Sequence, residues 1–258
     1  MGSDERSMPR SMIGRVTAVL GTFSGEEPVL GVNEIARRTG LAKSVTSRIL
    51  AELVAADYLE RTDRGLRVGI RLFELGELAQ RSKELRQLAL AAMADLRQAT
   101  GMTVQLSVLK GADQVYVEIL RGRDPDMVIR SRVGGRVPAY ATAGGKAVLA
   151  HASDDVVDLA IPEVFEPLGP GTVADEMSLR RQLEAVRTDG YAHETEESNP
   201  GVECIACPIL RADGTPIAAI SASGPAGRID MVRIAPAVRM AALGLNRRIR
   251  ANPAFSTL

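Results

Sequence analysis

The 258-residue chain has no run that approaches the roughly 20 apolar residues needed by a membrane-spanning helix. Its first ten residues carry charges and a proline where a secretion signal would have an apolar centre. Cysteine is scarce as well: only Cys204 and Cys207 occur, which argues against a disulfide framework. These absences predict a cytoplasmic protein that makes no membrane contact.

No charge of one sign dominates the chain, because 32 Lys and Arg residues balance 32 Asp and Glu residues. Phosphate binding depends on Lys and Arg, so this balance by itself argues against a nucleic-acid partner. The charge is unevenly distributed, however, and residues 31–71 contain eight basic and five acidic side chains. The surplus is small, and DNA binding must therefore be argued from where the basic residues lie.

A chain of this length fits two domains of unequal size, and the first is predicted to be mainly helical. Apolar residues recur at helical spacing over residues 11–23, 32–38 and 42–55. Thr39-Gly40-Leu41 supplies a tight turn between the second and third helices, with glycine where a positive φ costs little. Two helices joined in this way are typical of a helix-turn-helix, whose second helix enters the DNA major groove by its N-terminal end.

The third predicted helix would bury an apolar stripe and expose small polar and basic side chains on its first turns. The expected stripe consists of Val45, Ile49, Leu50 and Leu53. The exposed side chains are candidates for contact with base edges and phosphates. They are Lys43, Ser44, Thr46, Ser47 and Arg48.

A β-hairpin is predicted directly after this helix. Residues 59–61 and 66–68 alternate apolar and polar side chains around the turn Thr62-Asp63-Arg64-Gly65. Arg64 at its tip would reach a phosphate or the minor groove. Helix pairs with a glycine turn also occur in proteins that never bind DNA, but the complete order of three helices and a hairpin favours a winged helix-turn-helix.

An amphipathic connector follows, over residues 71–80 and 85–100. A lone helix cannot bury its apolar stripe, so the stripe is expected to pack on a second subunit or on the following domain. We therefore expect a DNA-binding domain over residues 1–70, a linker helix over 71–84, and a larger domain over 85–258.

Beyond Gly101 the hydrophobic pattern predicts an α+β domain built around an antiparallel sheet. The expected strands cover residues 104–108, 115–119, 127–133, 204–210 and 217–223. The expected helices cover residues 145–150, 154–160, 177–188 and 230–250.

The turn Asp213-Gly214 between the last two strands predicts their register. If it is a two-residue loop, Ala212 pairs with Thr215 and the rest of the ladder follows. One face of the hairpin would then carry small side chains with a thiol and two hydroxyls, which leaves space and hydrogen-bond donors for a ligand. Alternatively, these small residues serve only to let a helix pack tightly on this face, with no ligand involved. The face consists of Cys204, Ala206, Ser221 and Ser223.

Five segments of the chain, taken together and in their order along the sequence, are specific enough to indicate a protein family. They are residues 35–44 (IARRTGLAKS), 72–76 (LFELG), 141–147 (ATAGGKA), 201–209 (GVECIACPI) and 220–225 (ISASGP). In these residues the chain resembles the IclR-type family of bacterial transcriptional regulators, named for the isocitrate lyase regulator. The resemblance covers nearly the whole chain and implies a winged helix-turn-helix joined to a GAF-like effector domain.

The same resemblance implies a homodimer or homotetramer that binds operator DNA under the control of a small organic or aromatic acid. Where the family commonly has proline, this chain has Ala42, which weakens helix initiation. The acidic pocket position is Glu194, one methylene longer than aspartate, which leaves the effector's identity open. The implied effector-binding residues are Ile129, Val137, Ala143, Gly144, Glu194, Cys204, Ser221 and Ser223.

Catalytic and metal-binding interpretations are weaker. Cys204 and Cys207 lie three positions apart on a predicted strand, so their thiols point to opposite faces and do not share an ion or a disulfide. Gly144-Gly145-Lys146 lacks the remaining residues of a phosphate loop. The two histidines, His151 and His193, are far apart in sequence. We therefore predict a regulator without cofactor or metal. A small-molecule-binding or protein-interaction module, and an enzyme acting on a small organic acid, are the alternatives.

Overall fold

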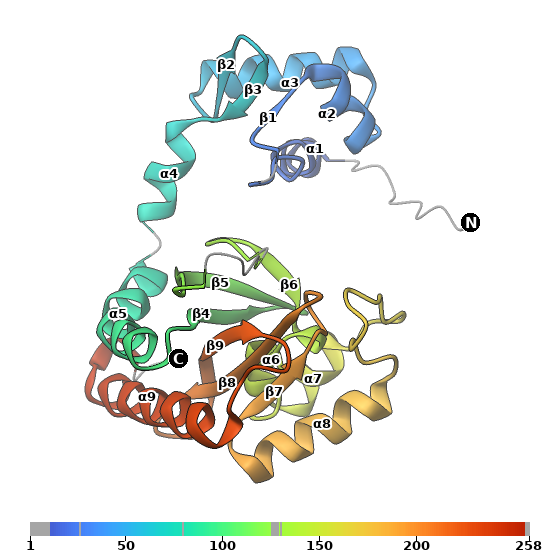
Figure 1. Ribbon diagram of the computed structural model, residues 1–258. Helices are drawn as coiled ribbons and strands as arrows, with labels where there is room; N and C mark the ends of the chain where they lie inside the picture. Colours follow the sequence, from blue (N-terminus) through green and yellow to red (C-terminus); the bar gives the residue numbers. More distant parts are fainter. Residues whose placement is uncertain (1–10, 26, 79, 125–128, 130, 256–258) are drawn as a thin grey trace. The chain divides into compact units, whose positions relative to one another are not determined.

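The computed structural model describes residues 11–25, 27–78, 80–124, 129 and 131–255 (Figure 1). It divides into two compact units, Met1–Gln80 and Arg81–Leu258. Each unit has an apolar core of its own and is described separately. Every helix within the described ranges is too short or too polar to span a lipid bilayer.

The N-terminal unit combines helices with a small antiparallel sheet of strand order β1-β3-β2. A turn joins α2 to α3, and Gly40 in this turn has a φ of 68°, a conformation that glycine adopts at little cost. The predicted winged helix-turn-helix is confirmed. Its helices are α1 (Met12–Leu20), α2 (Val32–Thr39), α3 (Lys43–Ala55) and α4 (Ile70–Glu77). Its strands are β1 (Val29–Leu30), β2 (Leu59–Thr62) and β3 (Gly65–Val68).

One apolar core holds these elements together. Ile35 of α2, Ile49 of α3 and Leu59 of β2 are all buried in it. In the hairpin, Thr62 pairs with Gly65, so the two residues between them form the tip of the wing. The predicted hairpin is therefore confirmed, whereas β1 was not predicted because two residues show no alternation.

Two helices lie between the hairpin and the first large strand. α4 ends at Glu77 and α5 (Gln80–Thr100) begins at Gln80, so residues 71–84 include the end of one helix and the start of the other. α4 has no buried residue in the single chain. Phe73 and Leu78 expose 64% and 72% of their surface.

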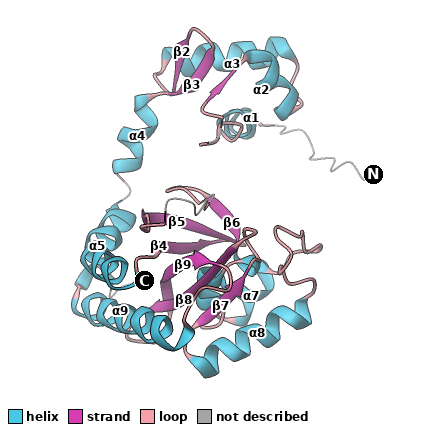
Figure 2. Ribbon diagram, in the orientation of Figure 1, coloured by secondary structure: helices cyan, strands magenta, loops and turns pink. Residues whose placement is uncertain are grey.

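The C-terminal unit is built on a six-stranded antiparallel sheet of order β6-β5-β4-β9-β8-β7 (Figure 2). The core on one face comes from α5 and α9, and the core on the other from α6, α7 and α8. The predicted α+β class is confirmed. The strands are β4 (Thr103–Lys110), β5 (Asp113–Leu120), β6 (Arg136–Pro138), β7 (Ala192–Thr195), β8 (Val202–Leu210) and β9 (Pro216–Pro225). The helices are α6 (Ala143–Leu149), α7 (Asp154–Ala160), α8 (Glu176–Asp189) and α9 (Met231–Ala251), with short 3-10 turns at Ala139–Ala141 and Pro253–Phe255.

The edges of this sheet differ from the sequence expectation. Of the strand expected over 127–133, residues 127, 128 and 130 lie outside the described residues, and the other four are in no strand. β6 pairs with β5 a few residues later. At the opposite edge β7 was missed, because its sequence His193-Glu194-Thr195 shows no apolar alternation.

The β8–β9 hairpin has the predicted register on its strands but not at its loop. Cys204 lies opposite Ser223, as predicted. The pairing of Ala212 with Thr215 is wrong, because the Arg211 amide donates to the Thr215 carbonyl and closes a three-residue loop. A register shift after Ile209 offsets the additional loop residue.

Candidate functional site

The N-terminal end of α3 presents an exposed polar surface. Lys43, Ser44, Ser47 and Arg48 are all exposed there, as predicted. Thr46 is wrongly assigned to this surface, because it is fully buried and its hydroxyl donates to the Ala42 carbonyl at 3.2 Å. Thr46 belongs to the buried stripe because it precedes Ile49, Leu50 and Leu53 by three, four and seven residues.

The basic side chains of this unit fall into two groups. Arg37 and Arg38 of α2 pair with Glu34, and this pairing lowers the pKa of Glu34 to about 2. Arg67 of the wing likewise pairs with Glu60. Among the described residues no acidic side chain pairs with the remaining candidates, which leaves their charge available to a partner. These candidates are Lys43, Arg48 and the wing-tip residue Arg64.

A closed cavity of about 20 Å³ lies on the face of the large sheet that α6 covers. Seven of the eight predicted effector residues line it, and Val137 on β6 does not. The cavity is polar on its sheet side, and the start of α6 and residues 198–199 line its other side. The seven are Ile129, Ala143, Gly144, Glu194, Cys204, Ser221 and Ser223.

The two glycines of α6 bring the start of this helix close to the sheet. A Cβ on Gly144 would lie 2.6 Å from Gln114 Oε1 and 3.0 Å from Ser107 Oγ. A Cβ on Gly145 would lie 2.2 Å from the Ala139 carbonyl oxygen. A larger residue at either position would therefore force the helix or the contacted atoms to move.

Glu194 and Cys204 face each other across β7 and β8, and both are buried. Glu194 accepts hydrogen bonds from the Glu197 amide at 2.9 Å and from Ser198 Oγ at 2.8 Å. Burial nevertheless raises the pKa of Glu194 to about 7 and that of Cys204 to about 12. At neutral pH the thiol is protonated and the carboxyl group is divided between both forms.

A buried ion pair fastens α6 beside this cavity. Lys146 Nζ lies 2.5 Å from Glu197 Oε1 and 2.8 Å from Gln182 Oε1 of α8. The side chains of Lys146 and Glu197 are only 1% and 6% exposed. Burying two charges costs desolvation free energy, and breaking the pair would leave an uncompensated buried charge. The pair therefore holds the loop after β7 against α6.

Six polar residues of the cavity were missed by the sequence analysis. Thr142, Ser198 and Asn199 lie outside the strands, whereas Gln105 lies on β4 and Gln114 and Tyr116 lie on β5. The analysis used only the apolar alternation of these strands, which packs toward α5 and α9. The residues between these apolar positions are largely buried too, because helices cover both faces of the sheet. Polar residues in a strand of this kind are the signal that could have revealed Gln105, Gln114 and Tyr116.

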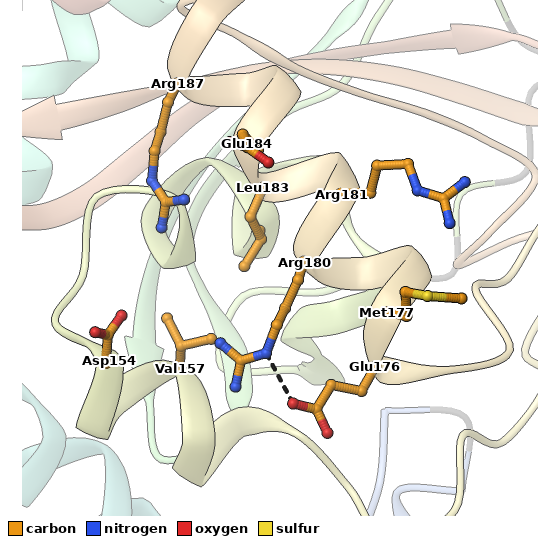
Figure 3. A pocket seen from close by; sticks show the side chains of 9 residues that line it. All are labelled: Asp154, Val157, Glu176, Met177, Arg180, Arg181, Leu183, Glu184 and Arg187. Carbon is orange, nitrogen blue, oxygen red and sulfur yellow. Dashed lines mark hydrogen bonds and ion pairs between the residues drawn. The ribbon is translucent and has the colours of Figure 1, made fainter.

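Two other features are excluded as the site. Cys204 and Cys207 belong to the cores on opposite faces of the sheet, as predicted, and the described residues contain no cluster that could hold a metal. A larger, open groove of about 720 Å³ lies between α7 and α8 (Figure 3). Its Arg180 pairs with Glu176 and Asp158, and Arg187 donates to a backbone carbonyl, so these arginines already have partners.

Comparisons with known proteins agree over both units. Residues 78–247 match the profile of the bacterial transcriptional regulator IclR C-terminal domain, and residues 13–63 match that of the IclR helix-turn-helix domain. The regulator XynR of Escherichia coli K12 is 30% identical over 241 residues, which cover 91% of this chain and 95% of XynR. KdgR of Dickeya chrysanthemi is 31% identical over 83% of this chain and 73% of KdgR.

Solved structures show the same fold. An IclR homolog from Microbacterium hydrocarbonoxydans, complexed with 4-hydroxybenzoate, has a TM-score of 0.83 at 33% identity and covers 94% of this chain and 100% of its own. A putative regulator from Rhodococcus sp. RHA1 has a TM-score of 0.75 at 28% identity, over 91% and 96% of the two chains. The winged helix-turn-helix and these matches define a DNA-binding transcriptional regulator. The chain belongs to the IclR family.

Proposed function

We propose that this regulator binds operator DNA through α3 and the wing, and that a small organic or aromatic acid in the closed cavity controls this binding. The observation that supports the proposal best is the cavity itself, which gathers buried polar side chains from β4, β5, β7, β8 and β9. In this proposal residues 1–70 bind DNA, 71–84 link, and 85–258 bind the effector and associate.

The proposed DNA contacts follow from exposure and charge. Lys43, Ser44, Ser47 and Arg48 lie on the end of α3 that would enter the major groove, and Arg64 at the wing tip would reach a phosphate or the minor groove. The small serines permit a close approach of the helix to base edges, whereas the basic side chains supply the electrostatic part of the affinity.

The proposed effector is a small acid, as the co-crystallised 4-hydroxybenzoate of the Microbacterium relative suggests. A cavity of about 20 Å³ holds roughly one water molecule, so the described state is closed to such a ligand. Binding therefore requires the walls to move. If the open arrangement favours one spacing of the DNA-binding units, the effector shifts the population by its difference in affinity for the two states.

Self-association is proposed to use the exposed apolar side chains of α4. Phe73 lies on a helix with no buried residue, Leu78 directly follows this helix, and exposed apolar surfaces of this kind are costly for a lone chain. A dimer brings two reading helices to two half-sites of an operator, and pairing of dimers gives a tetramer.

A two-stage experiment tests the proposed function. Thermal shifts of the purified protein are first recorded with small carboxylic and aromatic acids, and retardation of the flanking intergenic DNA is then measured with each acid that raises Tm. We expect at least one acid to raise Tm and to change DNA retardation. Retardation that no stabilising acid alters would contradict effector control, and no retardation under any condition would contradict operator binding.

A further inference from the structure

We propose that Gln105, Gln114 and Tyr116 determine which acid binds, by donating hydrogen bonds to an oxygen of the effector other than those of its binding carboxylate. This inference rests on the proposed function, because it concerns the same cavity. It assigns a further role to Ser221 and Ser223, whose hydroxyls position Gln105.

The three side chains form one polar wall. They lie on neighbouring strands, and all line the cavity. Gln105 and Gln114 are each 3% exposed, and Tyr116 is 7% exposed. Side chains buried to this extent lose their hydrogen bonds to water, so each of their polar groups needs a partner inside the protein or in a ligand.

The acceptor atoms of both glutamines are already used. Ser221 Oγ and Ser223 Oγ each donate to Gln105 Oε1 at 2.9 Å. Thr142 Oγ1 lies 2.6 Å from Gln114 Oε1, a distance typical of a hydroxyl that donates to a carbonyl oxygen and shorter than most N–H···O bonds. These hydrogen bonds fix the oxygen of each amide, which leaves the NH₂ group as the part of the amide without a close partner.

The donor atoms of the wall lack good partners. Gln105 Nε2 has only Ser131 Oγ, at the long distance of 3.5 Å. Within the described part of the chain, no group accepts from Gln114 Nε2 or from the Tyr116 hydroxyl. Burial raises the pKa of Tyr116, so its hydroxyl keeps its proton and remains a donor. Both amide NH₂ groups can only donate, and the Tyr116 hydroxyl can donate as well, so a ligand atom that satisfies all three must be an acceptor.

This arrangement selects among acids of similar size. An acid with an additional carbonyl or hydroxyl oxygen can accept from the wall, whereas an acid that presents only hydrocarbon leaves buried donors without partners. Sites of this kind reject the analogue that lacks the polar group, because the protein's own polar atoms are then left unpaired. We expect pyruvate to bind better than propionate, or 4-hydroxybenzoate better than benzoate.

Calorimetric titration of the full-length protein with these four acids tests the inference. For the wild type we expect one pair to show at least a tenfold preference for the oxygenated acid. Tyr116→Phe removes one donor and keeps the ring, and should reduce this preference about fivefold or more. Tyr191→Phe is the matched control, since Tyr191 packs on the opposite core and should leave the preference unchanged.

A double-mutant cycle tests the role of the serines. Ser223→Ala should weaken binding of the oxygenated acid more in the wild type than in the Gln105→Leu background, because a positioning residue acts through the group that it positions. Equal losses in both backgrounds would show that Ser223 does not act through Gln105 and would overturn its positioning role.

The outcomes separate the two proposals. If the wild type binds the acids but Tyr116→Phe leaves their preference unchanged, or if no pair shows a preference, the donor wall is refuted and effector control stands. If none of the four acids binds, both the donor wall and control by acids of these two kinds are contradicted.

Discussion

Several polar side chains of the cavity are hydrogen-bonded within the protein, and this pairing determines how each of them can act. Among the described residues, the buried carboxylate of Glu194 accepts two hydrogen bonds but has no cation in direct contact. Lys146 is instead paired with Glu197. The free energy of the closed cavity must therefore depend on the protonation of Glu194.

Glu194 makes stability depend on pH. The pKa of Glu194 is about 7 in the folded protein, whereas an unburied glutamate has a pKa of 4.5. Between these pH values the folded state therefore binds more protons than the unfolded state. Stability then falls as pH rises from about 4.5 through 7, with a contribution of about 3 kcal/mol, to order of magnitude. Urea unfolding at pH 5 and pH 8 should show a smaller loss for Glu194→Gln than for the wild type. Equal losses would contradict the assignment.

Gly144 is predicted to be irreplaceable because of space, not conformation. In Gly144→Ala the new Cβ would meet Gln114 Oε1 at 2.6 Å, which forces the amide or the helix to move. We expect a loss of about 1–3 kcal/mol in the free energy of unfolding and a weakened effector response. Gly244→Ala in α9 is the control: nothing lies within 4 Å of its Cβ, and it should stabilise the protein by about 0.5–1 kcal/mol. Urea unfolding measures both. Unchanged stability of Gly144→Ala would contradict the close approach.

At the scale of the elements, α3 and the wing carry basic side chains that form no ion pair with an acidic residue in the described part of the chain. Arg48 and Arg64 come from a helix and a hairpin tip, each exposed. Arg37 of α2 is exposed too, but it pairs with Glu34. These arginines should therefore differ in their effect on DNA binding even though all are on the surface.

Arg48→Ala combined with Arg64→Ala should weaken operator binding and reduce the salt dependence of its affinity. If each arginine contacts one phosphate, the slope of log K against log salt should become shallower by about 2. Arg37→Ala is the matched control and should change the slope little. Fluorescence anisotropy at several salt concentrations provides the measurement, and an unchanged slope in the double variant would refute both contacts.

The sequence pattern predicted the helices and the large hairpins well, because periods of 3.6 and 2 are visible wherever one face is apolar. It failed where that contrast was absent: three of the four residues of β7 are polar, and β6 has only three residues. The β8–β9 register was right although its loop was wrong, since a bulge offset the additional loop residue. Seven cavity residues came from the resemblance and the register, whereas Gln105 and Gln114 lay on the polar face that an apolar pattern ignores.

At the scale of the whole molecule, an operator with two half-sites would need an assembly of at least two chains to contact both at once. α4, near the end of the N-terminal unit, carries exposed apolar side chains, and nothing within the described part of its own unit buries them. If α4 supports self-association, the oligomer and the operator affinity should be lost together, because one subunit alone would contact a single half-site.

Phe73→Glu with Leu78→Glu should shift the protein toward the monomer in sedimentation experiments and weaken operator binding by tenfold or more. Charges placed in an apolar interface must be desolvated when it forms, so they oppose association. Val232→Glu is the control, because Val232 is 87% exposed on the first turn of α9, where a carboxylate is tolerated. An unchanged oligomer in the double variant would place the interface elsewhere.

The small volume of the cavity also has a consequence for how quickly the regulator would respond if an acid binds there. An acid cannot diffuse into a space that admits one water molecule, so each encounter would have to wait for the protein to open first. At high acid concentration the observed binding rate should then level off at the opening rate instead of rising in proportion. The time that a cell needs to detect the acid would be set by the opening of the cavity, however abundant the acid becomes.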